Sequence, residues 1–239
     1  MIRAENILPS GWLDVFDPHH ARIAIGIDPA TTTKKTSNPT SITVTQQVGL
    51  MYFERLVIRL KTGDGDVIEA LIGTISDGLR ARGLSVRRVC ILATNERFWA
   101  IGMRKRLARR APVELVIESE KIAYLGKEML VKAYLGNLFV NTIDDGYLPL
   151  PPCDWLKVDL RLVVKDRGTF DSEIGADGGH GDCFASGGAA LHGLISAGGP
   201  AEAEASGTST FRGPGAAGRK MLNPHAHLFR KYQSARLAM

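Results

Sequence analysis

The carboxylate of Asp28 ends an apolar run, RIAIGID, whose character predicts a buried strand over residues 22–28. An acid in that place must be hydrogen-bonded, paired or bound to a metal, because an unpaired buried charge is costly. Two later acids also stand where an element meets a loop. Glu96 follows the strand-like segment SVRRVCILAT, and Asp182 precedes the last predicted helix. If these three acids converge, they form a site for Mg²⁺ or Mn²⁺, which prefer hard oxygen ligands.

The chemistry of such a site would be phosphodiester cleavage. Two divalent ions roughly 3.5–4 Å apart can activate water and stabilise the leaving oxygen. Structural roles account for the same residue types. Asp28 suits an Asx turn, Glu96 suits a first-turn acid favoured by the helix dipole, and Asp182 suits an N-cap. Spacing alone leaves both interpretations open.

The order of the elements decides whether the acids can meet. The first half of the chain predicts strands at 22–28, 41–49 and 50–60, a helix at 66–83 and a strand at 85–94. The first three strands form an antiparallel meander, and Asp66 is the expected N-cap of the helix. A right-handed crossover then brings the fourth strand beside the first and parallel to it. Sites in such sheets lie at the carboxyl ends of neighbouring strands, so Asp28 and Glu96 are expected at one edge.

The second half predicts more helix than strand. We expect a basic helix at 95–111, a short strand at 113–119, a helix at 126–146, an extended Pro-rich segment at 147–156, a strand and hairpin at 159–174, and a final helix after the glycine-rich loop that begins at 175. Gly187 and Gly188 weaken the last helix by roughly 1 kcal/mol each. We interpret Phe98 and Trp99 as core residues, with base stacking as the alternative. The fold class is therefore α/β, with a mixed sheet flanked by helices.

Composition and charge bound the remaining possibilities. The 239 residues fit one substantial α/β domain at 21–196, after a lead-in at 1–20 and before a Gly/Ala-rich, basic tail at 197–239 that we interpret as flexible. No apolar run reaches the roughly 18 residues of a membrane span, and the first residues do not resemble a signal peptide. Three scattered cysteines favour reduced thiols and a cytoplasmic location.

A net charge of +5 mildly favours a polyanionic partner. The expected DNA-contacting cations are those of the basic helix and of the loop after Asp28: Arg104, Lys105, Arg106, Arg109, Arg110, Lys34 and Lys35. A solvated helix face is the alternative interpretation of the first five.

Four segments resemble the C-terminal nuclease domain of bacteriophage terminase large subunits, and the Mu-like phage and prophage group is the nearest match. The segments are GIDPA…SNPTSITV, ATNERFWAIGMRKRLA, GNLFVNTIDDGYLPLPPCDWLKVDLRLVVKDRG and ADGGHGDCFASGGAALHGL. The likeness covers about residues 20–195. It implies a ribonuclease-H-like fold, cleavage of double-stranded viral DNA during genome packaging with low intrinsic sequence specificity, and a cofactor of Mg²⁺ or Mn²⁺, with two ions expected.

The resemblance also implies roles for single residues. Asp28 and Asp182 take the metal-binding positions, His180 becomes either a further ligand or a group that contacts the ligands, and Glu96 is the third acid. The family pattern has an aspartate where this chain has Leu92, and often a second one where it has Ala185. The implied partners are double-stranded DNA, a packaging ATPase domain, the small terminase subunit and the portal protein, in the cytoplasm of a bacterial host.

Two alternatives stay open at this point. Leu92 and Ala185 favour a catalytically impaired module of the same fold that binds DNA or assists packaging. The segment GIDPATTT loosely resembles the first phosphate loop of actin-like phosphotransferases, although no second glycine-rich phosphate loop follows. The P-loop motif G-x-x-x-x-G-K-S/T is absent from the sequence, which excludes ATP hydrolysis by a P-loop mechanism here.

Overall fold

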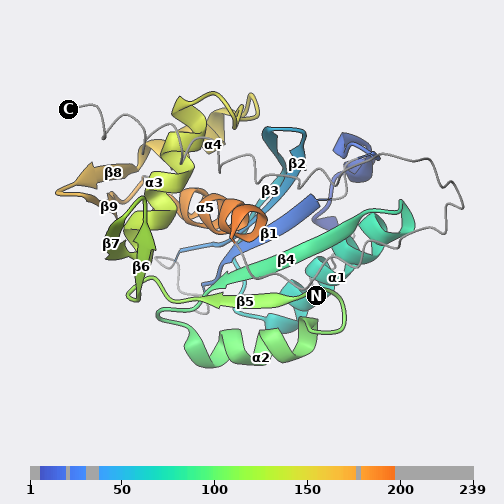
Figure 1. Cartoon of the computed structure of the whole chain (residues 1–239). Helices are drawn as coiled ribbons and strands as arrows, with labels where there is room; N and C mark the ends of the chain where they lie inside the picture. Colours follow the sequence, from blue (N-terminus) through green and yellow to red (C-terminus); the bar gives the residue numbers. More distant parts are fainter. Residues whose placement is uncertain (1–5, 20–21, 31–37, 176–178, 197–239) are drawn as a thin grey trace, which may run out of the picture. The chain divides into compact units, whose positions relative to one another are not determined.

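The central sheet has five strands in the order β3-β2-β1-β4-β5 (Figure 1). A computed structural model describes residues 6–19, 22–30, 38–175 and 179–196. The strands are β1 (Arg22–Asp28), β2 (Thr40–Val48), β3 (Met51–Leu60), β4 (Ser85–Leu92) and β5 (Val113–Val116). β1, β2 and β3 pair antiparallel, whereas β4 pairs parallel with β1, and β5 pairs parallel with β4. The predicted meander and crossover are therefore confirmed.

The register of the parallel strands brings their carboxyl ends to one edge. Ile27 of β1 pairs with Ile91 of β4, and Leu92 pairs with Val116 of β5. The chain leaves all three strands at this edge, so the segments that follow Asp28, Leu92 and Val116 are neighbours in space. This edge is where the acids were expected to meet.

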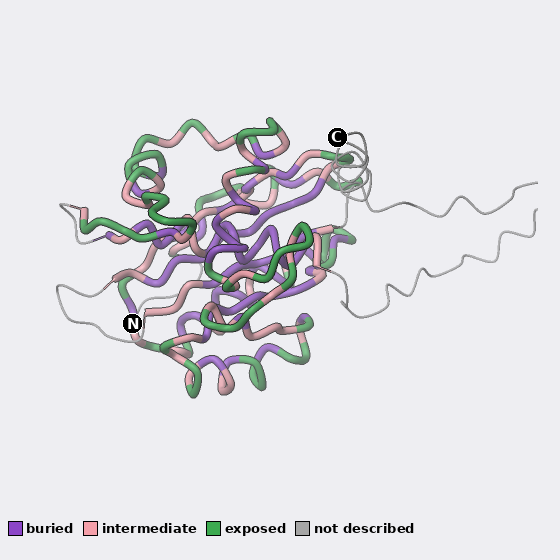
Figure 2. The backbone as a smooth tube through the Cα atoms, turned by 60° about the vertical axis from the view of Figure 1, so that its left-hand side comes forward, coloured by how far each residue is buried: buried purple, intermediate pink, exposed green. Residues whose placement is uncertain are grey.

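Two helical layers cover the sheet (Figure 1). The helices are α1 (Gly65–Ala81), α2 (Arg97–Leu107), α3 (Val131–Asp144), α4 (Asp154–Arg161) and α5 (Asp182–Ile195). Side chains alternate along β1, so Ile23, Ile25 and Ile27 join the core beneath α1 and α2, whereas Ala24 joins the core beneath α3 and α5. Figure 2 shows that the central strands are largely buried.

Helix α5 lies very close to β1, and glycine makes that approach possible. A Cβ placed on Gly26 would lie 1.9 Å from the backbone oxygen of Ser186 and 2.6 Å from the nitrogen of Ala190. Gly187 of α5 is similarly crowded, because a Cβ there would lie 2.6 Å from the ring of Phe139. Gly187 and Gly188, which weaken α5 as an isolated helix, thus allow α3 to pack closely against it, while Gly26 allows α5 to approach β1. Together these contacts fix where Asp182 begins the helix.

Three local predictions were wrong. Residues 121–130 form a hairpin, β6 (Lys121–Tyr124) and β7 (Lys127–Leu130), where a helix was expected from residue 126. Leu125 and Gly126 both have positive φ, 50° and 74°, which turns the chain back on itself. Residues 154–161, expected as extended chain and strand, form α4 after Pro151 and Pro152. The predicted hairpin follows as β8 (Val163–Asp166) and β9 (Thr169–Ser172).

The third difference concerns the start of α1. Asp64, not Asp66, is the N-cap, because its Oδ1 accepts a hydrogen bond of 2.9 Å from the backbone N–H of Asp66. In the lead-in segment, a short 3-10 helix η2 (Trp12–Val15) packs Trp12 against the core. Among the described residues, no helix is both long and apolar enough for a bilayer.

Candidate functional site

A cavity of about 550 Å³ opens at the carboxyl edge of β1, β4 and β5. Asp28 at the end of β1 lines it, as do Thr94 after β4 and Glu118 after β5. The start of α3, the β8–β9 hairpin and the turn before α5 complete the wall. The lining residues are Asp28, Asn38, Thr94, Asn95, Glu118, Ser119, Leu130, Lys132, Leu135, Gly136, Val163, Phe170, Ser172, His180, Gly181, Asp182, Phe184 and Ala185.

The acids of this cavity perturb one another. The pKa of Asp28 lies well above the usual value, first because of burial and then because of the charges of Asp182, Glu118 and Asp159. Burial, followed by the charge of Asp159, raises the pKa of Asp182 to about 6. Opposing effects from the backbone of His180 and the charge of Arg59 are smaller. In the absence of a cation, the cavity therefore disfavours the charged forms of both aspartates.

Asp182 is only 3% exposed, and its Oδ2 has no hydrogen-bond partner in the described part of the chain. A buried carboxylate oxygen usually has such a partner. An orphaned oxygen of this kind, in a cavity shared with other acids, is suited to a cation. Hard oxygen donors are the ligands that Mg²⁺ and Mn²⁺ prefer.

Glu118 occupies the place that we assigned from the sequence to Glu96. Thr94 Oγ1 donates to Glu118 Oε2 at 3.3 Å and accepts from the Glu118 backbone N–H at 2.9 Å, so the segments after two parallel strands are joined at the cavity. Glu96 is the N-cap residue of α2, and it does not line the cavity. The signal for Glu118 was present in the sequence, since the carboxyl-end rule that was applied to β4 applies equally to β5.

The turn that presents Asp182 is held by a second buried acid, Asp159 of α4. Asp159 is 1% exposed, and its Oδ2 accepts a hydrogen bond of 2.9 Å from the backbone N–H of Cys183. This bond supplies the cap that α5 lacks locally, because its N-cap residue is Gly181, with φ 72° and no side chain. Arg59 of β3 lies 3.4 Å from Asp159 Oδ1 and partly compensates its charge. Sequence patterns gave no signal for Asp159.

The DNA-contacting cations predicted on α2 and just after it do not line the cavity. Helix α2 joins the end of β4 to the start of the parallel strand β5, so its last turn points toward the opposite edge of the sheet. Arg106 pairs with Asp66 and with Glu69. Arg110 pairs with Asp77 at 2.5 Å.

The lysines predicted to hold a phosphate, Lys34 and Lys35, lie outside the described residues. Lys132, at the start of α3, does line the cavity, and its Nζ contacts Asp171 Oδ1 at 3.2 Å. A cation is therefore present on the wall of the acid cavity, although it comes from an element that the sequence had not marked for this role.

The donor set suits a divalent cation in chemistry, but the side chains are not gathered around one. Across residues 6–19, 22–30, 38–175 and 179–196, no three His, Cys, Asp or Glu side chains stand close enough together to hold a metal ion. Asp28, Glu118 and Asp182 come from three parts of the chain and share one cavity, and their like charges favour separation. A cation would draw these carboxylates closer.

Comparison with known proteins gives a clear result for structure only. No family model matches the sequence, and no curated protein matches it. The nuclease domain of the large terminase subunit of bacterial virus Sf6, solved with manganese and beta-thujaplicinol, matches with a TM-score of 0.50 at 12% identity, over 79% of this chain and 97% of that one.

Two further matches concern the same class of protein. The large terminase of a thermophilic bacteriophage matches with a TM-score of 0.49 at 12% identity, over 77% of this chain. The human cytomegalovirus terminase nuclease domain gives 0.48 at 13%, over 78% of this chain and 90% of that one. This chain spans 45% of the length of the thermophilic phage protein.

At such low identity the likeness to the Sf6 domain shows the fold alone. The chain has the fold of a large-terminase nuclease domain, and the predicted ribonuclease-H-like class is confirmed.

Proposed function

We propose that this chain is a divalent-metal-dependent endonuclease that cleaves double-stranded viral DNA during genome packaging. One observation carries the proposal: Asp28, Glu118 and Asp182 line a single cavity from three parts of the chain, with raised pKa values for both aspartates and an unpartnered oxygen on Asp182. Such a group of acids destabilises the folded state when no cation is bound. Acids with strongly perturbed pKa values cluster at functional sites. The terminase nuclease fold supports the reaction class.

The residues would divide the work as follows. Asp28 and Asp182 would hold the cation, with Glu118 as the third acid in place of Glu96 and His180 as a further ligand. Bound Mg²⁺ or Mn²⁺, two ions in the full site, would supply an activated water and stabilise the leaving oxygen. Lys132 would orient a phosphate by charge. Asp159 would keep the first turn of α5, and with it Asp182, in a fixed position.

The pKa values imply how the site responds to pH. Asp182 holds a proton below about pH 6, and Asp28 also retains its proton to an unusually high pH. A protonated carboxyl is a poor metal ligand, so the carboxyls must lose these protons before a cation binds. Cleavage should therefore rise with pH through about 6.

The decisive experiment is cleavage of supercoiled plasmid with Mn²⁺ or Mg²⁺. Wild type is expected to nick the plasmid, whereas Asp28→Asn and Asp182→Asn are expected to lose nicking. Asp154→Asn is the matched control, because its side chain is 99% exposed on α4. Equal nicking by wild type and Asp28→Asn would remove Asp28 from the mechanism.

A second function, DNA binding or packaging assembly without cleavage, has one specific observation in its favour. Leu92 is 4% exposed and packs in the core at the end of β4, and Ala185 lines the cavity, so neither position offers a carboxylate. This function predicts salt-sensitive DNA binding without nicking at any metal concentration. Nicking by wild type that Asp182→Asn abolishes would reject it.

The partners follow from the packaging role and belong to the same proposal. They are double-stranded DNA, a packaging ATPase domain, the small terminase subunit and the portal protein. The site of action would be the cytoplasm of the bacterial host.

A further inference from the structure

Helix α2 and the residues after it carry positive charge without any acid. Residues 97–111 contain six arginines and lysines and no aspartate or glutamate. The helix starts at the cavity, because Thr94 and Asn95 line the cavity and the helix begins at Arg97. The positively charged helix therefore runs from the acid cavity along the outside of the sheet.

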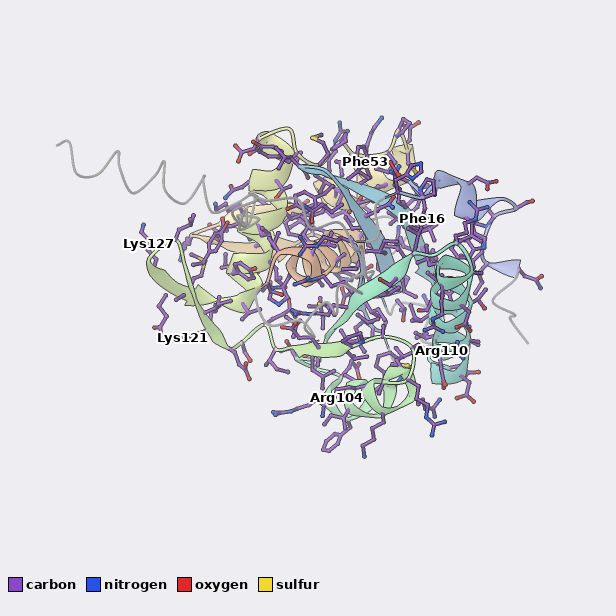
Figure 3. The ribbon with its side chains drawn as sticks, turned by 45° about the vertical axis from the view of Figure 1, so that its right-hand side comes forward. Phe16, Phe53, Arg104, Arg110, Lys121 and Lys127 are labelled. Carbon is purple, nitrogen blue, oxygen red and sulfur yellow. The ribbon has the colours of Figure 1, made fainter. Side chains whose placement is uncertain are left out.

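The cations of this segment fall into two groups. Arg106 and Arg110 are directed at acids of α1. Figure 3 shows the difference between the groups, with Arg104 extending from α2 into solvent and Arg110 lying beside α1. The second group forms a positively charged face on α2 and the turn after it. Its members are Arg97, Arg104, Lys105 and Arg109, whose side chains make no ion pair or hydrogen bond with the described part of the chain. Lys105 and Arg109 line a pocket with Glu69 and Asp77 of α1, whereas Arg97 and Arg104 do not.

Phe98 lies at the end of this face that is nearest the cavity. Its side chain is 93% exposed, whereas the sequence led us to expect it in the core. The neighbouring Trp99 is the one that packs against the core. An almost fully exposed phenyl ring in the first turn of α2, three residues beyond Asn95, offers an apolar contact, and no described residue buries it.

The helix dipole does not account for this arrangement. Cations are favoured in the last turn of a helix, which suits Arg104 and Lys105. Arg97 stands in the first turn, where a cation is unfavourable, and beside it Phe98 exposes apolar surface to water. A negatively charged partner that also contacts an aromatic ring accounts for the exposure of Arg97, Phe98, Arg104 and Lys105.

We propose that α2 is the surface on which duplex DNA lies beside the acid cavity. Arg97, Arg104, Lys105 and Arg109 contact phosphates, and Phe98 packs against a base step at the position to be cut. A helix of this length spans about 16 Å, which matches roughly five base pairs of duplex. This inference rests on the proposed function only where it places the DNA for cleavage. The DNA-binding surface itself is inferred from the positive charge of α2 and the exposure of Phe98.

Equilibrium binding of a fluorescein-labelled duplex, measured by anisotropy at several salt concentrations without divalent metal, tests the charged part. The variant Arg104→Gln, Lys105→Gln, Arg109→Gln is expected to bind roughly ten- to hundred-fold more weakly at about 0.1 M salt. Its slope of log K against log salt should be smaller in magnitude by about one for each lost contact. The control Lys157→Gln, Arg161→Gln, Arg167→Gln removes the same charge from exposed positions on α4 and the β8–β9 hairpin.

Phe98 is tested on its own, because an exposed side chain can be changed without disturbing the core. Phe98→Ala is expected to weaken binding to a duplex with a central mismatch by roughly five-fold or more, and Phe98→Tyr should restore it. A 2-aminopurine base at the mismatch should brighten with wild type and stay dim with Phe98→Ala.

The proposal would be overturned if the α2 triple variant bound DNA with wild-type affinity and salt slope. It would also be overturned if the control triple variant lost as much DNA affinity as the α2 variant. Unchanged DNA binding by Phe98→Ala would overturn the base-step contact of Phe98. The Asp28→Asn variant separates this proposal from the proposed function, because it should bind DNA through α2 like wild type while losing the cut. If wild type binds DNA through α2 but never nicks it, the proposed endonuclease function is wrong, whereas the proposed DNA-binding surface is supported.

Discussion

The two ends of α5 both hold buried ionisable groups, and only one end balances them. In the last turn, His192 Nε2 lies 2.8 Å from Glu114 Oε1, and Nδ1 lies 3.1 Å from the hydroxyl of Tyr134. Arg88 pairs with the same glutamate at 2.5 Å and also contacts Ser196. Burial alone would raise the pKa of Glu114, but the hydrogen bonds and charges of His192 and Arg88 outweigh burial and lower it.

The first turn of α5 shows the opposite condition. Burial, followed by the charges of Asp182, Glu118 and Asp159, raises the pKa of Asp28 there, and burial followed by the charge of Asp159 raises the pKa of Asp182. Arg59 compensates in part. Burial of charge therefore does not by itself mark a functional site. A structural role explains the balanced cluster, whereas the unbalanced one calls for a ligand.

The largest expected effect separates the two candidates for the third acid. Glu118→Gln should reduce the rate of plasmid nicking by roughly a hundred-fold, at the upper end of losses for groups that support a metal site. Glu96→Gln, at the N-cap of α2, should stay within a few-fold of wild type. The reverse ranking would return the third-acid role to Glu96.

Disrupting the ion-pair cluster at the last turn of α5 should lower the stability of the fold and leave DNA cleavage unchanged. Glu114→Gln leaves the Arg88 guanidinium buried without a charged partner. The free energy of unfolding should fall by about 2–3 kcal/mol, less than for a fully enclosed pair because the Glu114 side chain is 36% exposed. Urea unfolding measures this change. Nicking per folded molecule should match wild type, and a loss of nicking would link this cluster to the site.

The unbalanced end should respond to pH with the opposite sign to an ordinary salt bridge. The pKa of Asp182 is raised in the folded, metal-free protein, so the folded state binds more protons than the unfolded chain between about pH 4 and 6. Stability should therefore fall as pH rises through this interval, by about 2 kcal/mol from Asp182. Asp182→Asn should flatten that part of the curve in metal-free denaturant titrations. An equal fall in the variant would place the effect elsewhere.

The smallest effect concerns Asp159, which acts on Asp182 through charge and through the cap on α5. Asp159→Asn removes a charge that raises the pKa of Asp182, so the acid limb of the nicking–pH profile should move to lower pH by roughly a few tenths of a unit to one unit. Asp159→Ala also removes the acceptor for the Cys183 N–H and should lower stability by about 1 kcal/mol. An unmoved profile in Asp159→Asn would leave Asp159 a purely structural role.

The sheet was well predicted from the sequence because its signals are local and cumulative. The apolar runs of β1 and β4, and the helical spacing of α1, led to the observed strand order through the crossover rule. Helix α4 and the β6–β7 hairpin were not predicted, because α4 is short and the hairpin depends on positive φ at Leu125 and Gly126. Short elements take their form from packing more than from pattern.

The candidate site was predictable in part. Asp28 and Asp182 stand at element ends that topology brings to one cavity. Glu118 is two residues beyond β5, whereas Glu96 is four residues beyond β4 and already at the start of α2. Distance from the strand end decides which acid reaches the cavity. The exposure of Phe98 depends on which side of α2 faces the sheet, and two adjacent aromatics, Phe98 and Trp99, leave that side undetermined.

Anomalous diffraction from a crystal soaked in Mn²⁺ is the sharpest test of whether the acids of the cavity share a divalent cation. We predict an anomalous peak in the cavity, bonded to carboxylate oxygens of both Asp28 and Asp182, with Glu118 drawn toward it. A soaked crystal whose cavity holds no peak, or whose ion contacts neither aspartate, would refute the metal site.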